Sequence, residues 1–164
     1  GHEDEAAPLI EELMEEGSSS VPKGVVWLMA HSALAEAITL AGTEDQAAQE
    51  YSLLEPYAGR VPSIGAVARP SVNHSLGTLA ARAGWPEKAR SHFTAACEEH
   101  ERFGAIGWLA RTRLEWARML CRSGERDGDK PAARALLLQS KQGAEQLGVA
   151  DVADDSEMLL REIS

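Results

Sequence analysis

Cysteines, aromatic residues and long apolar runs are all scarce in this sequence. Only two cysteines are present, Cys97 and Cys121, and aromatic residues make up 5% of the chain. No apolar stretch approaches the roughly 18 residues that a membrane span requires, and no secretory apolar segment is seen. Two cysteines without a CxxC pair are typical of buried, reduced thiols. We therefore expect a cytoplasmic protein that makes no membrane contact.

Signals for β-strands are absent as well. Runs in which Val, Ile, Thr or Tyr alternate with polar residues do not occur, so the sequence predicts no strand. The chain is instead 44% hydrophobic and rich in Ala, Leu, Glu and Arg, the residues that lose least on entering a helix. Apolar periodicity predicts helices at about 3–16, 23–41, 44–57, 67–83, 86–103, 106–123, 131–147 and 151–162. An all-α fold is expected.

Basic residues are outnumbered. The chain has 16 Lys and Arg against 26 Asp and Glu, a formal net charge of -10. Such a chain repels a phosphate backbone, which argues against direct binding of nucleic acids. The charge is uneven, however. Residues 1–20 carry seven carboxylates and no Lys or Arg, whereas residues 67–123 carry nine basic residues and five Glu, a local charge of +4.

Three glycines divide the chain at nearly regular intervals. Gly42, Gly84 and Gly124 each follow an amphipathic segment, and each is expected to end a helix, because glycine accepts the left-handed C-terminal conformation. After each glycine comes a second segment with a small residue and, four positions later, a large one. These pairs are Ala47 with Tyr51, Ala89 with Phe93, and Ala133 with Leu137, spaced 42 and then 44 residues apart. The spacing predicts three helix–turn–helix units.

The middle unit carries the clearest pattern. Leu76, Gly77 and Ala80, followed by Ala89 and Phe93, match the spacing of the tetratricopeptide repeat, L-G-x2-Y and then A-x3-F. A period near 42 also suits HEAT-type repeats, but these placements favour the tetratricopeptide interpretation. We therefore expect an α-α superhelix of about three helical hairpins with flanking helices. Residues 1–164 would form a single such domain, cut from a larger protein.

Four sequence blocks resemble one family. They are Leu54–Arg60, Leu76–Ala80, Ala89–Phe93 and Gly104–Arg113. In this order the blocks resemble the C-terminal helical-repeat region of large bacterial signalling proteins that contain a signal-transduction ATPase module. Some of those proteins add a class III adenylate cyclase domain, and others add a LuxR-type helix-turn-helix for transcription regulation. The resemblance covers roughly residues 8–148, and it implies a non-catalytic sensor or scaffold segment used in protein–protein interaction.

Signatures of catalysis and cofactor binding are missing. The sequence contains no G-x4-GK[ST], GxGxxG or HExxH motif, and its histidines do not have the spacing of metal ligands. We therefore predict that this chain is not an enzyme and has no cofactor or metal. Two alternatives stay open. One is a stand-alone adaptor that binds a peptide, and the other is an enzyme or small-ligand domain, which would require a deep apolar pocket with convergent polar groups.

The most informative polar residues fall on the first helix of each expected pair, which in tetratricopeptide units faces the concave groove. The groove-facing residues predicted by this register are Ser32, Glu36, His74, Thr78, Arg82, Arg111, Arg118 and Arg122. The last three arginines are spaced seven and four residues apart, so they lie along one stripe of a helix. Guanidinium groups bind carboxylates in a bidentate manner.

Two interpretations of this arginine stripe are possible. In the first, the stripe makes a positive groove that receives an acidic segment of a partner protein or of the parent protein. The acidic residues 1–20 make self-association as a homodimer a competing outcome. In the second, Glu115 lies one turn from both Arg111 and Arg118 and joins them in an ordinary surface ion-pair network.

The N-terminal segment contains an apolar stripe at helical spacing, formed by Leu9, Ile10, Leu13 and Met14. We interpret it as a helix left over from a preceding repeat. It is expected to pack against the helix at residues 23–41 and to leave an exposed cut end.

Overall fold

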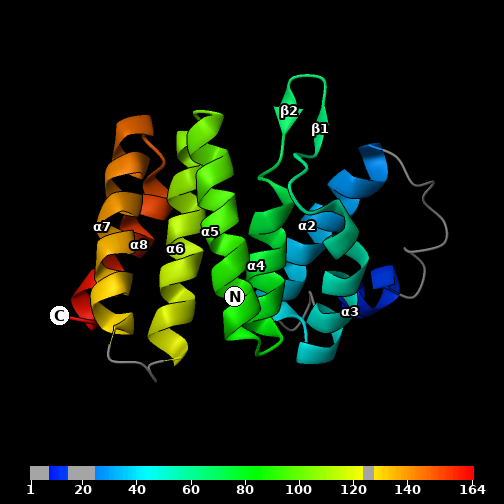
Figure 1. The fold of residues 1–164 in the computed structure, drawn as a ribbon, viewed down its shortest axis with the longest axis horizontal. Helices are drawn as coiled ribbons and strands as arrows, with labels where there is room; N and C mark the ends of the chain where they lie inside the picture. Colours follow the sequence, from blue (N-terminus) through cyan, green and yellow to red (C-terminus); the bar gives the residue numbers. More distant parts are fainter. Residues whose placement is uncertain (1–7, 15–24, 124–127) are drawn as a thin grey trace.

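The computed structural model describes residues 8–14, 25–123 and 128–164. Within these ranges the chain is helical apart from turns and one small hairpin (Figure 1). A short helix covers residues 8–14. The longer helices are α2 (Val25–Ala41), α3 (Glu44–Leu54), α4 (Val72–Arg82), α5 (Pro86–Arg102), α6 (Ile106–Ser123), α7 (Asp129–Leu147) and α8 (Ala150–Glu162). The predicted all-α fold is confirmed.

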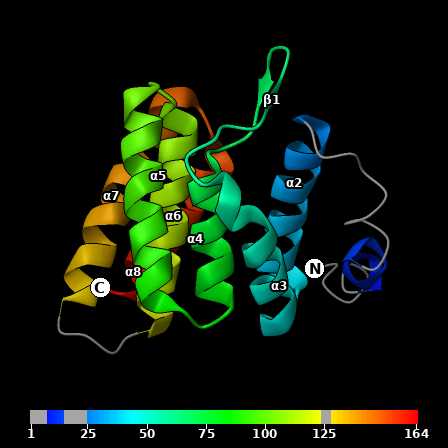
Figure 2. The same ribbon diagram turned by 45° about the vertical axis from the view of Figure 1, so that its right-hand side comes forward.

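The helices form pairs that stack side by side. Within the pairs, α2 packs on α3, α4 on α5 and α6 on α7, and the helices α2, α4, α6 and α8 contact one another in succession. Figures 1 and 2 show this row, with α2 and α3 at one end and α7 and α8 at the other. The arrangement is the expected α-α superhelix of helical hairpins. α8 occupies the place that the first helix of a further pair would take.

The hydrophobic core runs the length of the stack between the two layers of helices. Each pair contributes large side chains that are almost completely buried, among them Leu54, Leu76, Phe93, Leu114 and Leu137. Such positions recur because each repeat cannot bury its apolar face alone and must pack on its neighbours.

Local sequence signals set several helix ends. Thr43 forms a capping box with Gln46: its side chain accepts the Gln46 N–H at 3.2 Å, and its own N–H donates to the Gln46 side chain at 2.9 Å. Gly84 follows α4 with a φ of +75°, which confirms the expected glycine end of that helix. The Trp85 N–H then donates to the Ala80 carbonyl at 2.8 Å, and Pro86 opens α5. Gly124 lies outside the described residues.

The connection between α3 and α4 differs from the prediction. The predicted helices at 44–57 and 67–83 are too long, because α3 ends at Leu54, a 3-10 turn follows (Glu55–Tyr57), and α4 begins only at Val72. Between them lies a small antiparallel hairpin of β1 (Ser63–Ile64) and β2 (Val67–Ala68), so the expectation of no strand was wrong. Gly65 turns the hairpin with a φ of +57°, and Pro70 disfavours helical backbone at the residue before it.

Only part of the apolar stripe of the N-terminal helix is buried. Ile10 is 2% exposed and belongs to the same core cluster as Trp27 of α2, and Met14 packs against that cluster. Leu9 and Leu13 remain exposed. The segment therefore joins the core, as expected, through one side of the predicted stripe.

In the part of the chain that the structure describes, no helix combines the length and apolarity that crossing a lipid bilayer requires.

Candidate functional site

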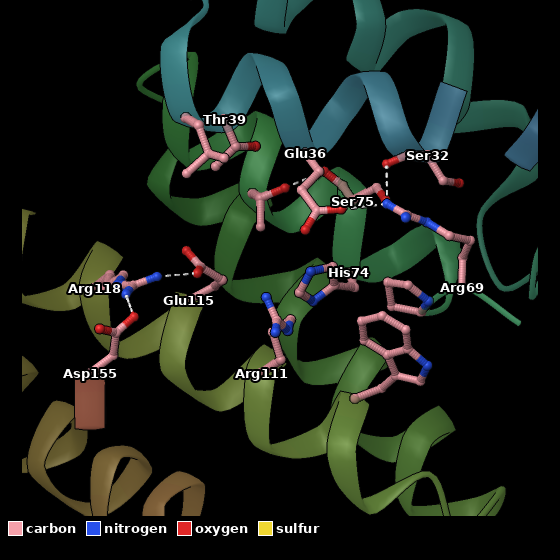
Figure 3. A pocket seen from close by; sticks show the side chains of 14 residues that line it. Ser32, Glu36, Thr39, Arg69, His74, Ser75, Arg111, Glu115, Arg118 and Asp155 are labelled. Atoms are coloured by element: carbon pink, nitrogen blue, oxygen red, sulfur yellow. Dashed lines mark hydrogen bonds and ion pairs between the residues drawn. The ribbon is translucent and has the colours of Figure 1, made fainter. Parts of the chain in front are cut away.

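The first helices of the stacked pairs line one groove. Side chains from α2, α4, α6 and α8 surround a cavity of about 240 Å³ (Figure 3). Its polar lining residues are Ser32, Glu36, Thr39, Arg69, His74, Ser75, Thr78, Arg111, Glu115, Arg118 and Asp155, and its apolar ones include Leu40, Pro70 and Trp108. The groove arises because residues one or two turns apart on each first helix share a face.

Six of the eight residues predicted to face the groove line it: Ser32, Glu36, His74, Thr78, Arg111 and Arg118. Their use in binding stays a prediction.

The other two arginines lie elsewhere. Arg82 donates from Nε to the Gly42 carbonyl at 2.9 Å, and its Nη2 donates to the same oxygen, so it joins two neighbouring repeats. Arg122 is an exposed residue in the last turn of α6 and does not line the cavity.

The charge of the lining differs from the expected positive groove. Three arginines (Arg69, Arg111, Arg118) face three carboxylates (Glu36, Glu115, Asp155), so the formal charges cancel. Arg69 donates to the Glu36 carboxylate at 2.5 Å, and Arg118 pairs with both Glu115 and Asp155. Arg111 pairs with Asp151, which does not line the cavity. An acidic ligand must therefore compete with carboxylates that the chain itself supplies.

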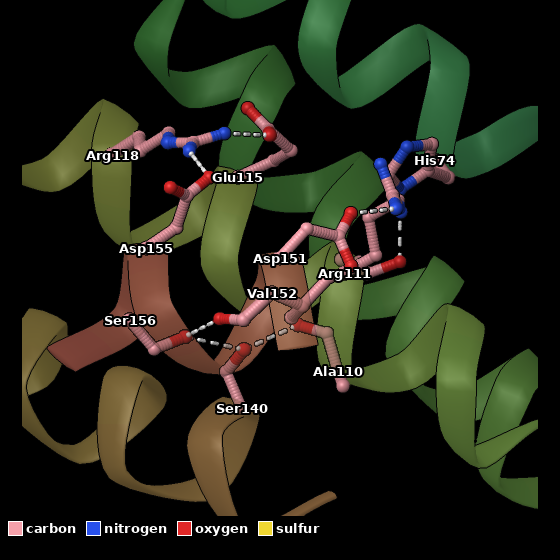
Figure 4. Close-up of polar contacts among 11 residues, drawn as sticks. His74, Ala110, Arg111, Glu115, Arg118, Ser140, Asp151, Val152, Asp155 and Ser156 are labelled. Carbon is pink, nitrogen blue, oxygen red and sulfur yellow. Dashed lines mark hydrogen bonds and ion pairs between the residues drawn. The ribbon is translucent and has the colours of Figure 1, made fainter. Parts of the chain in front are cut away.

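Arg118 is the most firmly held of the groove arginines. It donates from Nη1 to Glu115 and from Nη2 to Asp155 of α8, each at 2.5 Å, and Figure 4 shows both contacts. Burial lowers the pKa of Arg118, but the two carboxylates outweigh it, so the pKa lies above its ordinary value. The Glu115 contact matches the second interpretation of the arginine stripe at this residue.

Arg111 is held more loosely. Its Nη2 donates to the Asp151 carboxylate of α8 at 3.0 Å, and the two side chains are 34% and 65% exposed. Ion pairs as exposed as this one contribute only about 0–1 kcal/mol. Glu115 pairs with Arg118, whereas Arg111 pairs with Asp151 of α8.

His74 forms the floor of the groove through a buried network. Its Nδ1 lies 2.9 Å from Thr112 Oγ1, and this oxygen lies 3.2 Å from Nδ1 of His100. The Ser71 N–H donates to Nε2 of His100 at 3.0 Å. A neutral His100 therefore carries its hydrogen on Nδ1 and donates it to Thr112.

The pKa of His74 predicts sensitivity to acid. Burial, aided by the positive charges of His100, Arg111 and Arg69, lowers it from 6.5 to about 3. The unfolded chain takes up this proton near pH 6.5, whereas the folded chain does so only near pH 3. We therefore expect the free energy of unfolding to fall below pH 6.5, by up to ~1.4 kcal/mol per pH unit from this group.

Urea unfolding of the wild type and of His74→Asn between pH 7.5 and 4.5 measures this effect. The pKa values of His92 and His100 are also lowered, mainly by burial, so the variant should keep a reduced acid dependence. Equal slopes in the two proteins would show that His74 does not contribute.

Sequence reasoning missed three groups of the site. Arg69 fell inside the predicted helix at 67–83, but it lies in the irregular connection before α4, so helical register could not give the direction of its side chain. Asp151 and Asp155 had a usable signal, because they are four residues apart in a predicted helix and so share a face. The four-residue spacing of Asp151 and Asp155 is three residues shorter than the seven-residue spacing of Arg111 and Arg118, yet both pairs meet because α6 and α8 cross in contact.

Within the described ranges, no three His, Cys, Asp or Glu residues are grouped as a metal ion would require. Comparisons with known protein families, with curated proteins and with solved structures find no match to this chain.

Proposed function

We propose that this chain is a non-catalytic protein-interaction segment that binds a peptide of a partner in the groove of α2, α4, α6 and α8. The observation that carries the proposal is the convergence of side chains from four successive first helices on one cavity. A stacked array of helical pairs presents its binding residues in this way. The bound peptide would cross several repeats, so that each helix contributes a few contacts.

The size and lining of the cavity favour a peptide. Its volume of about 240 Å³ lies below the roughly 300–1,000 Å³ of usual small-molecule pockets. Its floor offers hydroxyl and imidazole groups from Ser75, Thr78 and His74, and Leu40 at its edge is 71% exposed. A single side chain of a peptide fits such a space, and the flanking polar groups suit its backbone.

We further propose that the parent is a bacterial signalling or transcription-regulatory ATPase. The support is the order of the blocks Leu54–Arg60, Leu76–Ala80, Ala89–Phe93 and Gly104–Arg113. The sequence of the full-length gene tests this directly. An ATPase module upstream is expected, and its absence would favour a stand-alone peptide-binding adaptor.

Groove binding can be tested with a matched pair of substitutions. Thr39 lines the groove and donates to the Ala35 carbonyl, whereas Thr94 lies exposed on α5 and donates in the same way to the Arg90 carbonyl. We expect Thr39→Trp to fill the groove and to weaken peptide binding at least about tenfold, a change of about 1.4 kcal/mol. Thr94→Trp should leave binding unchanged.

The measurement is fluorescence anisotropy with a library of acidic, neutral and basic peptides, alongside sedimentation to detect a homodimer. The proposal is wrong if no peptide of any composition binds, or if Thr39→Trp binds as well as Thr94→Trp. Dimerisation that Thr39→Trp abolishes would identify a second copy of the chain as the occupant.

A further inference from the structure

We propose that Arg111 and His74 form a receptor for one carboxylate of the bound peptide, at the centre of the groove. This inference rests on the proposed function, because it names the chemistry of the peptide in the same groove. It also separates the predicted arginines: Arg111 contacts the ligand, whereas Arg118 and Arg82 hold the repeats together.

The first argument is convergence. His74 and Arg111 come from α4 and α6, and Figures 3 and 4 both show the Arg111 guanidinium beside the His74 ring. Both residues line the cavity, together with the Trp108 ring one turn before Arg111. An Arg fork and an imidazole N–H that face the same space are suited to the two oxygens of a carboxylate.

The second argument is that Arg111 can change partners at little cost. Its one hydrogen bond within the described part of the chain goes to Asp151, which is 65% exposed. A ligand carboxylate that replaces Asp151 leaves the number of charges around Arg111 unchanged, and Asp151 returns to water. Arg118 cannot change partners so easily, because it is held by both Glu115 and Asp155.

The third argument concerns His74, which is 9% exposed. Its Nδ1 is occupied by Thr112, and within the described residues no hydrogen bond is found for its Nε2. The Thr112 hydroxyl donates its single hydrogen to the Trp108 carbonyl at 2.8 Å, and on binding of a carboxylate the hydroxyl turns this hydrogen to Nδ1 of His74 instead. When Nδ1 accepts it, the imidazole hydrogen sits on Nε2 and is free to donate to a ligand.

The charge of the site selects a carboxylate over a phosphate group. The three arginines of the lining contact four carboxylates of the chain: Glu36, Asp151, Glu115 and Asp155. A singly charged ligand that takes the place of Asp151 at Arg111 leaves this number unchanged, whereas a phosphate group of charge near −2 would add a further negative charge.

The test compares two arginines of the same helix. Arg113 lies two residues from Arg111, on another face of α6, and likewise pairs with a single carboxylate, Glu101, at 2.7 Å. With an acidic peptide from the library, we expect Arg111→Ala to weaken binding about ten- to a hundredfold and Arg113→Ala to leave it unchanged. Asp151→Asn removes the internal competitor and should strengthen binding a few fold.

The source of the carboxylate is resolved by varying the peptide. Glu→Gln changes remove side-chain carboxylates one at a time, and C-terminal amidation removes the terminal one. One of these changes should match the loss in Arg111→Ala and have no further effect in that variant. In the complex, 15N chemical shifts should place the His74 hydrogen on Nε2, with the His100 hydrogen still on Nδ1.

The inference is overturned if peptides bind and Arg111→Ala matches Arg113→Ala, if Asp151→Asn weakens binding, or if a phosphopeptide is preferred to its Glu counterpart. Peptide binding that depends on Thr39 but on no carboxylate would retain the proposed function and reject this inference. Absence of all peptide binding would reject both.

Discussion

Replacing Phe93 with alanine is expected to lower the free energy of unfolding by about 3–5 kcal/mol, the usual cost of truncating a fully buried aromatic side chain. Phe93 has no exposed surface and lies at the crossing of α4 and α5. Its ring packs directly over Gly77 and stacks near Trp116 of α6, with ring centroids 6.1 Å apart. The truncation therefore opens a cavity that touches two repeats at once. Urea unfolding monitored by circular dichroism measures the loss.

Gly77 provides the companion test of this contact. A Cβ atom at this position would lie 2.7 Å from Cδ1 of Phe93, so Gly77→Ala should also destabilise the protein by overpacking. In the double variant Gly77→Ala, Phe93→Leu, the leucine side chain is smaller than the phenylalanine ring and leaves room for the methyl group of the new alanine. The two effects should then be less than additive. A loss below about 1 kcal/mol for Phe93→Ala would mean that the packing of this repeat is misassigned.

The spacing of small and large residues is what made the fold predictable. Gly77 and Phe93 must meet wherever two helices cross closely, so their pattern in the sequence reports directly on packing. The same reasoning does not apply to the connection before α4. In that connection the hairpin depends on Gly65 and Pro70. Ile64 and Val67 are both exposed, so the strands have no alternating pattern of burial that the sequence could indicate.

The sequence predicted which residues line the groove better than it predicted the net charge of that lining. Helical register placed Glu36, His74 and Arg111 on groove-facing turns, because residues three or four apart share a face. The partners of the arginines depend on how far apart the helices lie and on which side chains reach across. Asp155 belongs to α8 and contacts Arg118 of α6, a pairing between helices that no local pattern contains.

Removal of the Glu50 carboxylate is expected to have an effect as large as that of the Phe93 truncation. Glu50 of α3 is 1% exposed, and its Oε1 lies 2.7 Å from Nδ1 of His31 in α2, which is 5% exposed. The His31 ring also packs on Trp27, with ring centroids 4.0 Å apart. Glu50→Ala leaves His31 buried without its partner and should cost about 3–5 kcal/mol.

Two further variants separate the polar contact from simple packing. Glu50→Gln keeps an oxygen acceptor and nearly the same volume, so its loss should be smaller, about 1–2 kcal/mol. The double variant His31→Leu, Glu50→Leu replaces both polar groups with apolar ones, and it should be more stable than Glu50→Ala, because no buried group then lacks a partner. Urea unfolding of these proteins, together with the single variants His31→Leu and Glu50→Leu that complete the double-mutant cycle, gives the coupling energy between the two sites. If Glu50→Ala unfolds within about 1 kcal/mol of the wild type, the pair is not what joins α2 to α3, and apolar contacts around Trp27 must hold the first repeat together.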